Sequence, residues 1–278
     1  MKVMTALLQK EWLEGWKSGK LVWLPIAMMI VGLTQPLTIY YMPDIIAHGG
    51  NLPDGMKISF TVPSGSEVMV STLSQFNTLG MALIIFSVMV STLSQFNTLG
   101  MALIIFSVMG CVANERNQGV TALIMSRPVT AAHYIVSKWL TQSVIGILSF
   151  AAGYGLAYYY VRLLFEDASF SRFAASLGLY ALWVIFIVTA GLAGSTIFRS
   201  VGAAAACGIG LTAAVSFAVS LFPDGAKWLP AEICKQAEHI LLHGERADFF
   251  GWSLTFSILC IMLLAVFSVW RFRRYESY

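Results

Sequence analysis

Charged side chains are scarce in this sequence. Asp, Glu, Lys and Arg make up only 11% of its 278 residues, whereas 58% of the residues are hydrophobic. Soluble domains carry roughly 25% charged residues. The composition therefore excludes an ordinary soluble domain and predicts a polytopic membrane protein. We expect membrane lipid around such a chain and no nucleic-acid partner.

Other features are missing altogether. No Gly-x-x-x-x-Gly-Lys-Ser/Thr phosphate loop occurs, so we expect no ATP site of that type and no cofactor on this chain. The first 20 residues are charged and have no apolar core, which argues against a cleavable signal peptide. The few cysteines have no short-spaced pair and predict no disulfide framework: Cys111, Cys207, Cys234 and Cys260.

The first 20 residues instead predict an interfacial helix. Leu8, Trp12 and Trp16 recur at helical spacing, with charged residues between them. Tryptophans on one helix face are typical of the headgroup region of a bilayer. A frayed polar tail is the alternative for residues 1–20.

Long apolar runs predict an all-α fold with six transmembrane helices in a single domain that covers residues 1–278. Each run can cross a hydrocarbon core of about 30 Å: 21–42, 90–113, 139–161, 173–198, 201–222 and 250–270. Pro25 and Pro36 are expected to kink the first span or to mark its ends. The spans show no carboxylate or basic relay, which argues against proton- or sodium-coupled transport.

The distribution of basic residues predicts the orientation of the chain. With six spans and cytoplasmic termini, 11 of the 17 Lys and Arg residues lie on the cytoplasmic side. A seventh span would invert the basic segment 271–274 and leave 9 basic residues inside against 8 outside. Because basic loops stay in the cytoplasm, we expect multi-pass insertion in the cell membrane with both termini cytoplasmic.

A tandem duplication surrounds the second span. Residues 68–89 and 88–109 are the same 22-residue string, offset by 20 residues. Architectural repeats share only a pattern and differ elsewhere, so perfect identity indicates a recent in-frame duplication. We expect the second copy to form the second span, because it is continuous with the loop that follows. The first copy would then be displaced outward or folded as a re-entrant segment.

The loop after the second span carries a motif. In order, it contains an acidic residue, a Gly-x-Thr, a short apolar stretch, an Arg-Pro-Val-Thr run and a lysine: Glu115, Gly119, Thr121, 122–125, 127–130 and Lys138. This pattern resembles the permease subunits of type-two ATP-binding-cassette (ABC) transporters, which are mostly bacterial exporters. The N-terminal Lys10-Glu11-Trp12, the six spans and the basic C-terminus also resemble that family. Arg127 departs from the family pattern, in which the basic residue often follows the Pro-Val pair.

The resemblance implies that this loop is a cytoplasmic coupling helix. In that family the loop docks into a groove on a separate ABC ATPase subunit, which binds ATP, and two permeases form a dimer of identical or similar copies. The candidate coupling residues are Glu115, Arg116, Gly119, Thr121, Leu123, Arg127 and Pro128. The charges of Glu115, Arg116 and Arg127 would complement the partner. A solvated connection with a capped helix is the alternative.

The segment before the last span contains Cys234, His239 and His243, with the histidines at i and i+4 on one helix face. That spacing suits a metal ion, but no second helix supplies further ligands. We favour an amphipathic helix on the outer surface and expect no metal. Its apolar residues are expected to face lipid: Trp228, Leu229, Ile233, Ile240 and Leu241.

Two other functional classes share parts of this pattern. A non-transporting membrane protein, such as an immunity or regulatory factor that sequesters a partner, would have the same composition. A membrane-embedded enzyme would need His, Asp or Glu residues at a common depth, and the spans lack such a set. We therefore expect no catalytic residue, and we favour an ABC exporter permease.

The duplication generates a direct prediction. Deleting residues 70–89 restores one uninterrupted copy. Because a packed helix cannot absorb 20 extra residues, which would rotate its far end by about 200°, the shortened chain should insert into membranes at least as well as the present one. Membrane fractionation with a C-terminal tag measures this. A shortened chain that no longer inserts would mean that the extra copy is a required part of the protein.

Overall fold

The structure is a computed structural model, and it describes residues 2–48, 92–126, 128–165, 169–222, 225–245 and 249–275. Within these ranges every regular element is helical, as the composition predicted. Among the described residues, six helices are long and apolar enough to cross a membrane: Lys20–Thr38, Thr92–Asn117, Ala131–Leu163, Phe170–Ile197, Val201–Leu221 and Phe250–Arg274. The prediction of an all-α protein with six transmembrane helices is confirmed.

The elements follow the chain in a simple order. They are α1 (Lys2–Lys17), α2 (Lys20–His48), the π-helical segment η1 (Phe96–Gly100), α4 (Met101–Val108), α5 (Gly110–Asn117), α6 (Val120–Met125), α7 (Ala131–Phe165), α8 (Phe170–Ile197), α9 (Val201–Leu221), α10 (Glu232–His243) and α11 (Phe250–Tyr275). The second span, Thr92–Asn117, contains η1, α4 and α5.

Two helices, α2 and α7, extend beyond what the apolar runs and the prolines predicted. α2 continues through Pro25 and Pro36, so neither proline ends the helix; transmembrane helices tolerate such interruptions when neighbours satisfy the freed backbone groups. α7 begins at Ala131 rather than at residue 139, and Lys138 therefore lies inside this helix. A boundary drawn where hydropathy falls misses a helix that continues through a buried charge.

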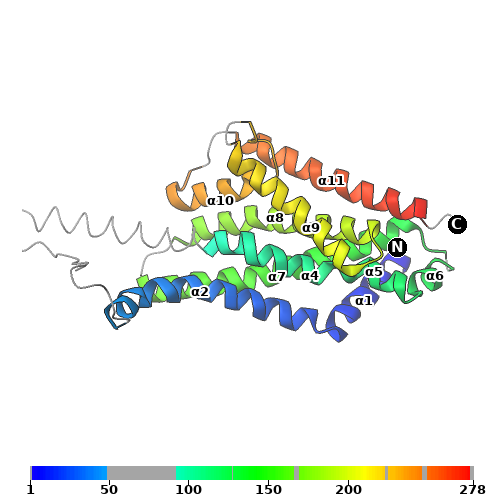
Figure 1. Cartoon of the computed structure of the whole chain (residues 1–278), viewed down its shortest axis with the longest axis horizontal. Helices are drawn as coiled ribbons and strands as arrows, with labels where there is room; N and C mark the ends of the chain where they lie inside the picture. The colour runs from blue at the N-terminus through cyan, green and yellow to red at the C-terminus, as the bar shows by residue number, and fades with distance from the viewer. Residues whose placement is uncertain are drawn as a thin grey trace, which may run out of the picture.

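Both ends of the chain lie at the same end of the helical bundle. Figure 1 shows α1, α5, α6 and the C-terminal end of α11 gathered there, whereas α10 lies in the opposite half. The six candidate spans of the described residues fit this arrangement, because an even number of crossings returns the chain to the side where it began. The loop that carries the sequence motif is therefore next to both termini.

α8 is the centre of the bundle. It contacts α4, α5, α7, α9, α10 and α11, and the side chains of Tyr180, Trp183 and Val184 are almost fully buried. Phe150 of α7 stacks on Tyr180 with ring centroids 4.7 Å apart. Such pairs stabilise a contact beyond their buried area, so the spans are fixed by an aromatic core.

Part of the duplicated region lies outside the described residues. Residues 92–109 belong to the second copy and form part of the second span, in which Leu93, Phe96 and Ile105 are buried. The first copy, 68–89, falls wholly outside, so its displacement stays a prediction. α1 is helical with Trp12 and Trp16 exposed, while its place at the membrane surface also stays a prediction.

The prediction that α10 directs its apolar face to lipid is wrong for its main residues. Ile233, Ile240 and Leu241 are buried, because α10 packs against α8 and α11. Trp228, which precedes the helix, is half exposed. The amphipathic pattern was correct, but another helix of the same chain covers the apolar face.

α2 and α7 approach each other closely at Gly32 and Gly153. A Cβ atom added to Gly153 would overlap the carbonyl oxygen of Met28 and lie 2.6 Å from its carbonyl carbon. A Cβ on Gly32 would overlap the carbonyl oxygen of Gly153. Small residues permit such backbone contact between membrane helices.

Gly153→Ala should therefore force the two helices apart and lower the free energy of unfolding by about 1–3 kcal/mol. Thermal unfolding in detergent measures the effect. Gly155→Ala is the matched control, because nothing lies within 4 Å of its added Cβ, and it should leave stability unchanged or slightly higher. Equal stability of the two variants would contradict the close contact.

Candidate functional site

A buried ion-pair cluster lies where α1, α5 and α7 meet. The Lys138 ammonium is fully buried, and its Nζ lies 2.9 Å from Glu11 Oε1 and 3.1 Å from Glu115 Oε1. Lys10 also forms an ion pair with Glu115, and it lies 3.3 Å from Glu14. Two lysines and three glutamates from three helices thus share one site.

The cluster exists because each helix brings one charged face to the same point. Lys10 and Glu11 are adjacent in α1, and Glu14 lies about one turn further along the same helix, which packs along α7. Glu115 is near the end of α5, and Lys138 is two turns into α7. A buried charge destabilises a protein unless it is paired and hydrogen-bonded, so these charges must keep the three helices together.

Tyr134 connects the cluster to the last span. Its hydroxyl donates a hydrogen bond to Glu115, and its ring stacks on Phe272 of α11 with centroids 5.0 Å apart. The Arg116 guanidinium lies 5.9 Å from the centroid of the same Phe272 ring. α11 is therefore joined to α5 and α7 at the base of the loop.

A second set of hydrogen bonds fastens α5 to α8. Ser195 Oγ accepts hydrogen bonds from the backbone N–H groups of Val112 and Ala113, both at 3.0 Å. The Arg116 guanidinium donates to the carbonyl oxygen of Thr196 at 3.3 and 3.4 Å. The Ser195 hydroxyl thus bonds to a neighbouring helix, and the end of α5 is held on two sides.

The charges around Lys10 shift its pKa in opposite directions. Burial and the charge of Lys138 lower the pKa of Lys10, but the hydrogen bond to Glu115 and the charges of Glu11 and Glu115 outweigh them. The net result is a raised pKa. The stabilisation from this lysine is therefore complete at neutral pH and is lost only as the pH rises through the raised value.

The loop beyond α5 is short and partly exposed. Gly119 has φ of +72°, in the left-handed region that favours glycine, and it turns the chain into α6. On α6, Thr121 is buried whereas Leu123 is 69% exposed. An apolar groove separates α6 from α1, lined by Leu7, Lys10, Val120, Ile124, Pro128 and Val129 among others.

The structure separates the predicted coupling residues into two groups. Glu115 and Thr121 are buried and Arg116 is half-buried, whereas Gly119, Leu123 and Pro128 are exposed. Arg127 lies outside the described residues. The charge of Glu115 is thus directed to Lys10 and Lys138 rather than to a partner. Any part that it takes in coupling would run through the position of the loop.

Sequence reasoning missed the cluster itself. Lys10, Glu11 and Lys138 were noted as parts of a resemblance, but nothing in the sequence indicated that they meet around Glu115. Tyr134 was not noted at all. The signal available was indirect: charges in an apolar chain must find partners, and the charges of the N-terminal helix are the nearest candidates on the same side of the membrane.

Three of these carboxylates, Glu11, Glu14 and Glu115, lie close enough together to suggest a cation site. The ammonium groups of Lys10 and Lys138 already occupy the space between them. This geometry is that of an ion-pair network. On α10, in the opposite half of the bundle (Figure 1), Cys234 is buried, and His239 Nδ1 lies 3.2 Å from the carbonyl oxygen of Glu245.

These features define a multi-pass membrane protein with a short exposed helix anchored to the base of its spans. Comparison with known proteins identifies the family. Residues 5–275 match the model of the ABC-2 family transporter protein, and the chain belongs to this family. It is also 90% identical, over 278 residues and the full length of both chains, to the "Uncharacterized transmembrane protein YxlG" of Bacillus subtilis (strain 168). The chain therefore has the domain of a permease-type subunit, as the loop motif predicted.

The cluster makes Glu115 a residue that stabilises the fold. Glu115→Gln leaves Lys138 buried with one carboxylate fewer and should lower the free energy of unfolding by about 3 kcal/mol. Unfolding of the purified protein in detergent measures this. Glu14→Gln, the same change at a half-exposed position of the cluster, should cost no more than about 0.5 kcal/mol. Similar losses for both variants would contradict the importance of burial.

Proposed function

We propose that this chain is the membrane-spanning subunit of an ABC exporter whose ATP is bound and hydrolysed by a separate ATPase subunit. The family supports a permease role, and the motif residues support ATP-driven export through their resemblance to exporter permeases. The chain itself contributes no catalytic residue and no cofactor in this proposal. Its task is to convert movement of the ATPase into movement of the spans.

The observation that carries the proposal is the exposed surface of α6 and α1. Leu123 stands out from α6, and an apolar groove lies beside it against α1. A large apolar side chain in a loop at the membrane surface would be unfavourable in water, and it is suited to a groove on a partner. This surface lies beside both termini (Figure 1), on the side that the charge distribution assigns to the cytoplasm.

The contacts at the base of the loop provide a route for transmitting motion. A force on α6 reaches α5 across only Gln118 and Gly119. From α5 it reaches α7 and α1 through the Glu115 ion pairs, and it reaches α8 through Ser195. Because packed helices move as rigid bodies between discrete arrangements, closure of the ATPase pair would displace several spans together in an alternating-access cycle.

A second permease completes the proposed transporter. α9 is among the least covered spans, with 28% of its apolar window buried inside the protein, against 61% for α8. Phe217 and Leu221 are exposed on it. We propose that a second copy of this chain, or a similar permease, packs in this region, as the family resemblance implies.

The docking proposal is tested at Leu123. Leu123→Asp places a charge on the exposed apolar contact of α6 and should reduce co-purification of the ATPase with the tagged permease by at least about tenfold, since a buried unpaired charge is unfavourable at an interface. Membrane insertion should not change, because the side chain is exposed.

Gln118→Glu serves as the control for added charge. Gln118 is also exposed but precedes the turn at Gly119, so this isosteric variant should retain the ATPase. Full retention of the ATPase by Leu123→Asp, or failure of the unmodified permease to co-purify with any ATPase, would overturn the proposed function.

A further inference from the structure

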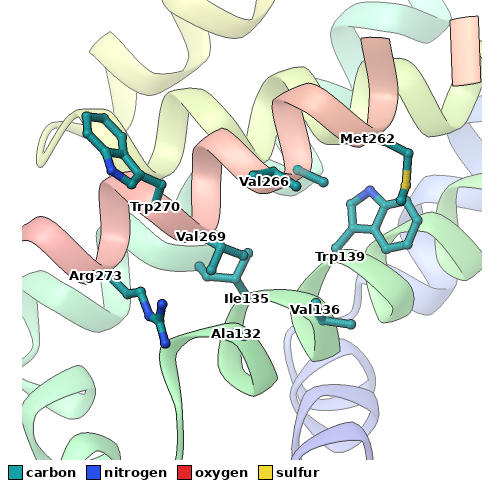
Figure 2. A pocket seen from close by; sticks show the side chains of 10 residues that line it. Ala132, Ile135, Val136, Trp139, Met262, Val266, Val269, Trp270 and Arg273 are labelled. Atoms are coloured by element: carbon teal, nitrogen blue, oxygen red, sulfur yellow. The ribbon is translucent and has the colours of Figure 1, made fainter. Parts of the chain in front are cut away.

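A groove lies between α7 and α11, and its lining runs from Ala132 and Arg273 to Trp139 and Met262. Figure 2 shows its walls: Ile135, Val136 and Trp139 come from α7, and Val266, Val269 and Arg273 come from α11. Arg273 lies at one end of the groove, beside Ala132, and Met262 lies with Trp139 at the other end. Apart from Arg273, the lining is almost entirely apolar.

The groove has the length of one bilayer leaflet. Its α11 wall runs from Met262 to Arg273, a difference of 11 positions and roughly 16 Å of helix axis. The hydrocarbon core of a bilayer is about 30 Å thick, so one leaflet is about half of that. With Arg273 at the end of the last candidate span, Phe250–Arg274, the groove reaches from the membrane surface to near the midplane.

The surface end of the groove carries the groups that a phospholipid headgroup requires. Arg273 is the basic residue that lines the groove there. Trp270 lies at the same depth and is half exposed, as interfacial tryptophans are. Arg guanidinium groups bind phosphate oxygens with paired hydrogen bonds, and basic pockets between membrane helices suit anionic headgroups.

We propose that this groove binds one anionic phospholipid from the leaflet on the side of the chain termini, with an acyl chain along α7 and α11 and its phosphate at Arg273. The wall chemistry supports this occupant. A peptide or a soluble metabolite would leave its polar groups unpaired against Ile135, Val136 and Val269, which is unfavourable. An acyl chain has no such groups.

The site also lies next to the ion-pair cluster. Phe272, adjacent to Arg273, stacks on Tyr134, and Tyr134 precedes the groove residue Ile135. A lipid bound here would hold α11 against α7 at the level where α7 carries the cluster. The proposal nevertheless stands independently of the ATPase, because it concerns only the lipid-facing side of this chain.

Native mass spectrometry of the full chain in detergent tests the proposal. The protein is titrated with phosphatidylglycerol or with phosphatidylethanolamine of the same acyl chains, which is zwitterionic. We expect one tightly bound phosphatidylglycerol, with about fivefold weaker binding of phosphatidylethanolamine and about fivefold weaker binding of phosphatidylglycerol to Arg273→Gln. Arg274→Gln removes the same charge one residue further on, outside the groove lining, and should bind as the unmodified protein does.

A second pair of variants tests the acyl-chain part of the site. Val266→Trp fills the groove and should lose the bound lipid, whereas Leu263→Trp adds the same bulk at an equally exposed position of α11 that does not line it, and should retain the lipid. Val266 and Leu263 are 62% and 60% exposed, so neither change should unfold the protein. Equal binding of the two lipids, or equal effects within either pair of variants, would overturn the proposal. Occupation of the groove by a second copy of the chain would appear as a dimer that Val266→Trp dissociates, and it would overturn the proposal too.

Discussion

The Lys138 ammonium has no contact with solvent, and a buried cation must have anionic partners from within the protein. Its two partners come from distant parts of the chain: Glu11 is 127 residues away in the sequence, and Glu115 belongs to the preceding span. The pairing brings the N-terminal helix, the end of the second span and the start of the third span to one point. The rest of this end of the bundle depends on that arrangement.

This constraint explains why a short exposed helix can have a fixed position. α6 is only six residues long, too short to be stable by itself. Its position is set by α5, which is held to α7 through Glu115 and to α8 through Ser195. The exposed Leu123 is thereby presented on a rigid base. The structure thus separates two roles within one loop, since Glu115 and Arg116 fasten it to the spans while Leu123 faces outward.

The general architecture could be predicted from the sequence because it follows from apolar length and charge bias alone. Six runs long enough for a bilayer became six helices, and the motif beginning at Glu115 pointed to the correct family. The span boundaries could not be predicted as well, since hydropathy falls at Lys138 although the helix begins seven residues earlier, at Ala131. Only the distant partners of Lys138 make that charge compatible with a buried helix.

The sequence also could not predict which neighbour covers each apolar or charged helix face. The pattern of α10 showed that Ile233 and Leu241 share a face, but not that α8 rather than lipid covers it. Likewise, Glu115 was recognised as part of a motif, whereas its burial depends on residues of α1 and α7. Pair contacts between distant segments carry no local signal, so periodicity and composition could not place them.

The central claim is that the buried charges hold α1 and the loop onto the spans. Amide hydrogen exchange of Lys138→Met, compared with the unmodified chain in the same detergent, tests it most directly. Removing the ammonium leaves Glu11 and Glu115 buried without their shared partner, so exchange should become faster in α1, in the last turn of α5 and in α6, while the centre of α8 stays protected. Unchanged exchange in α1 and α6 would contradict the account, because those elements would then be held by other contacts.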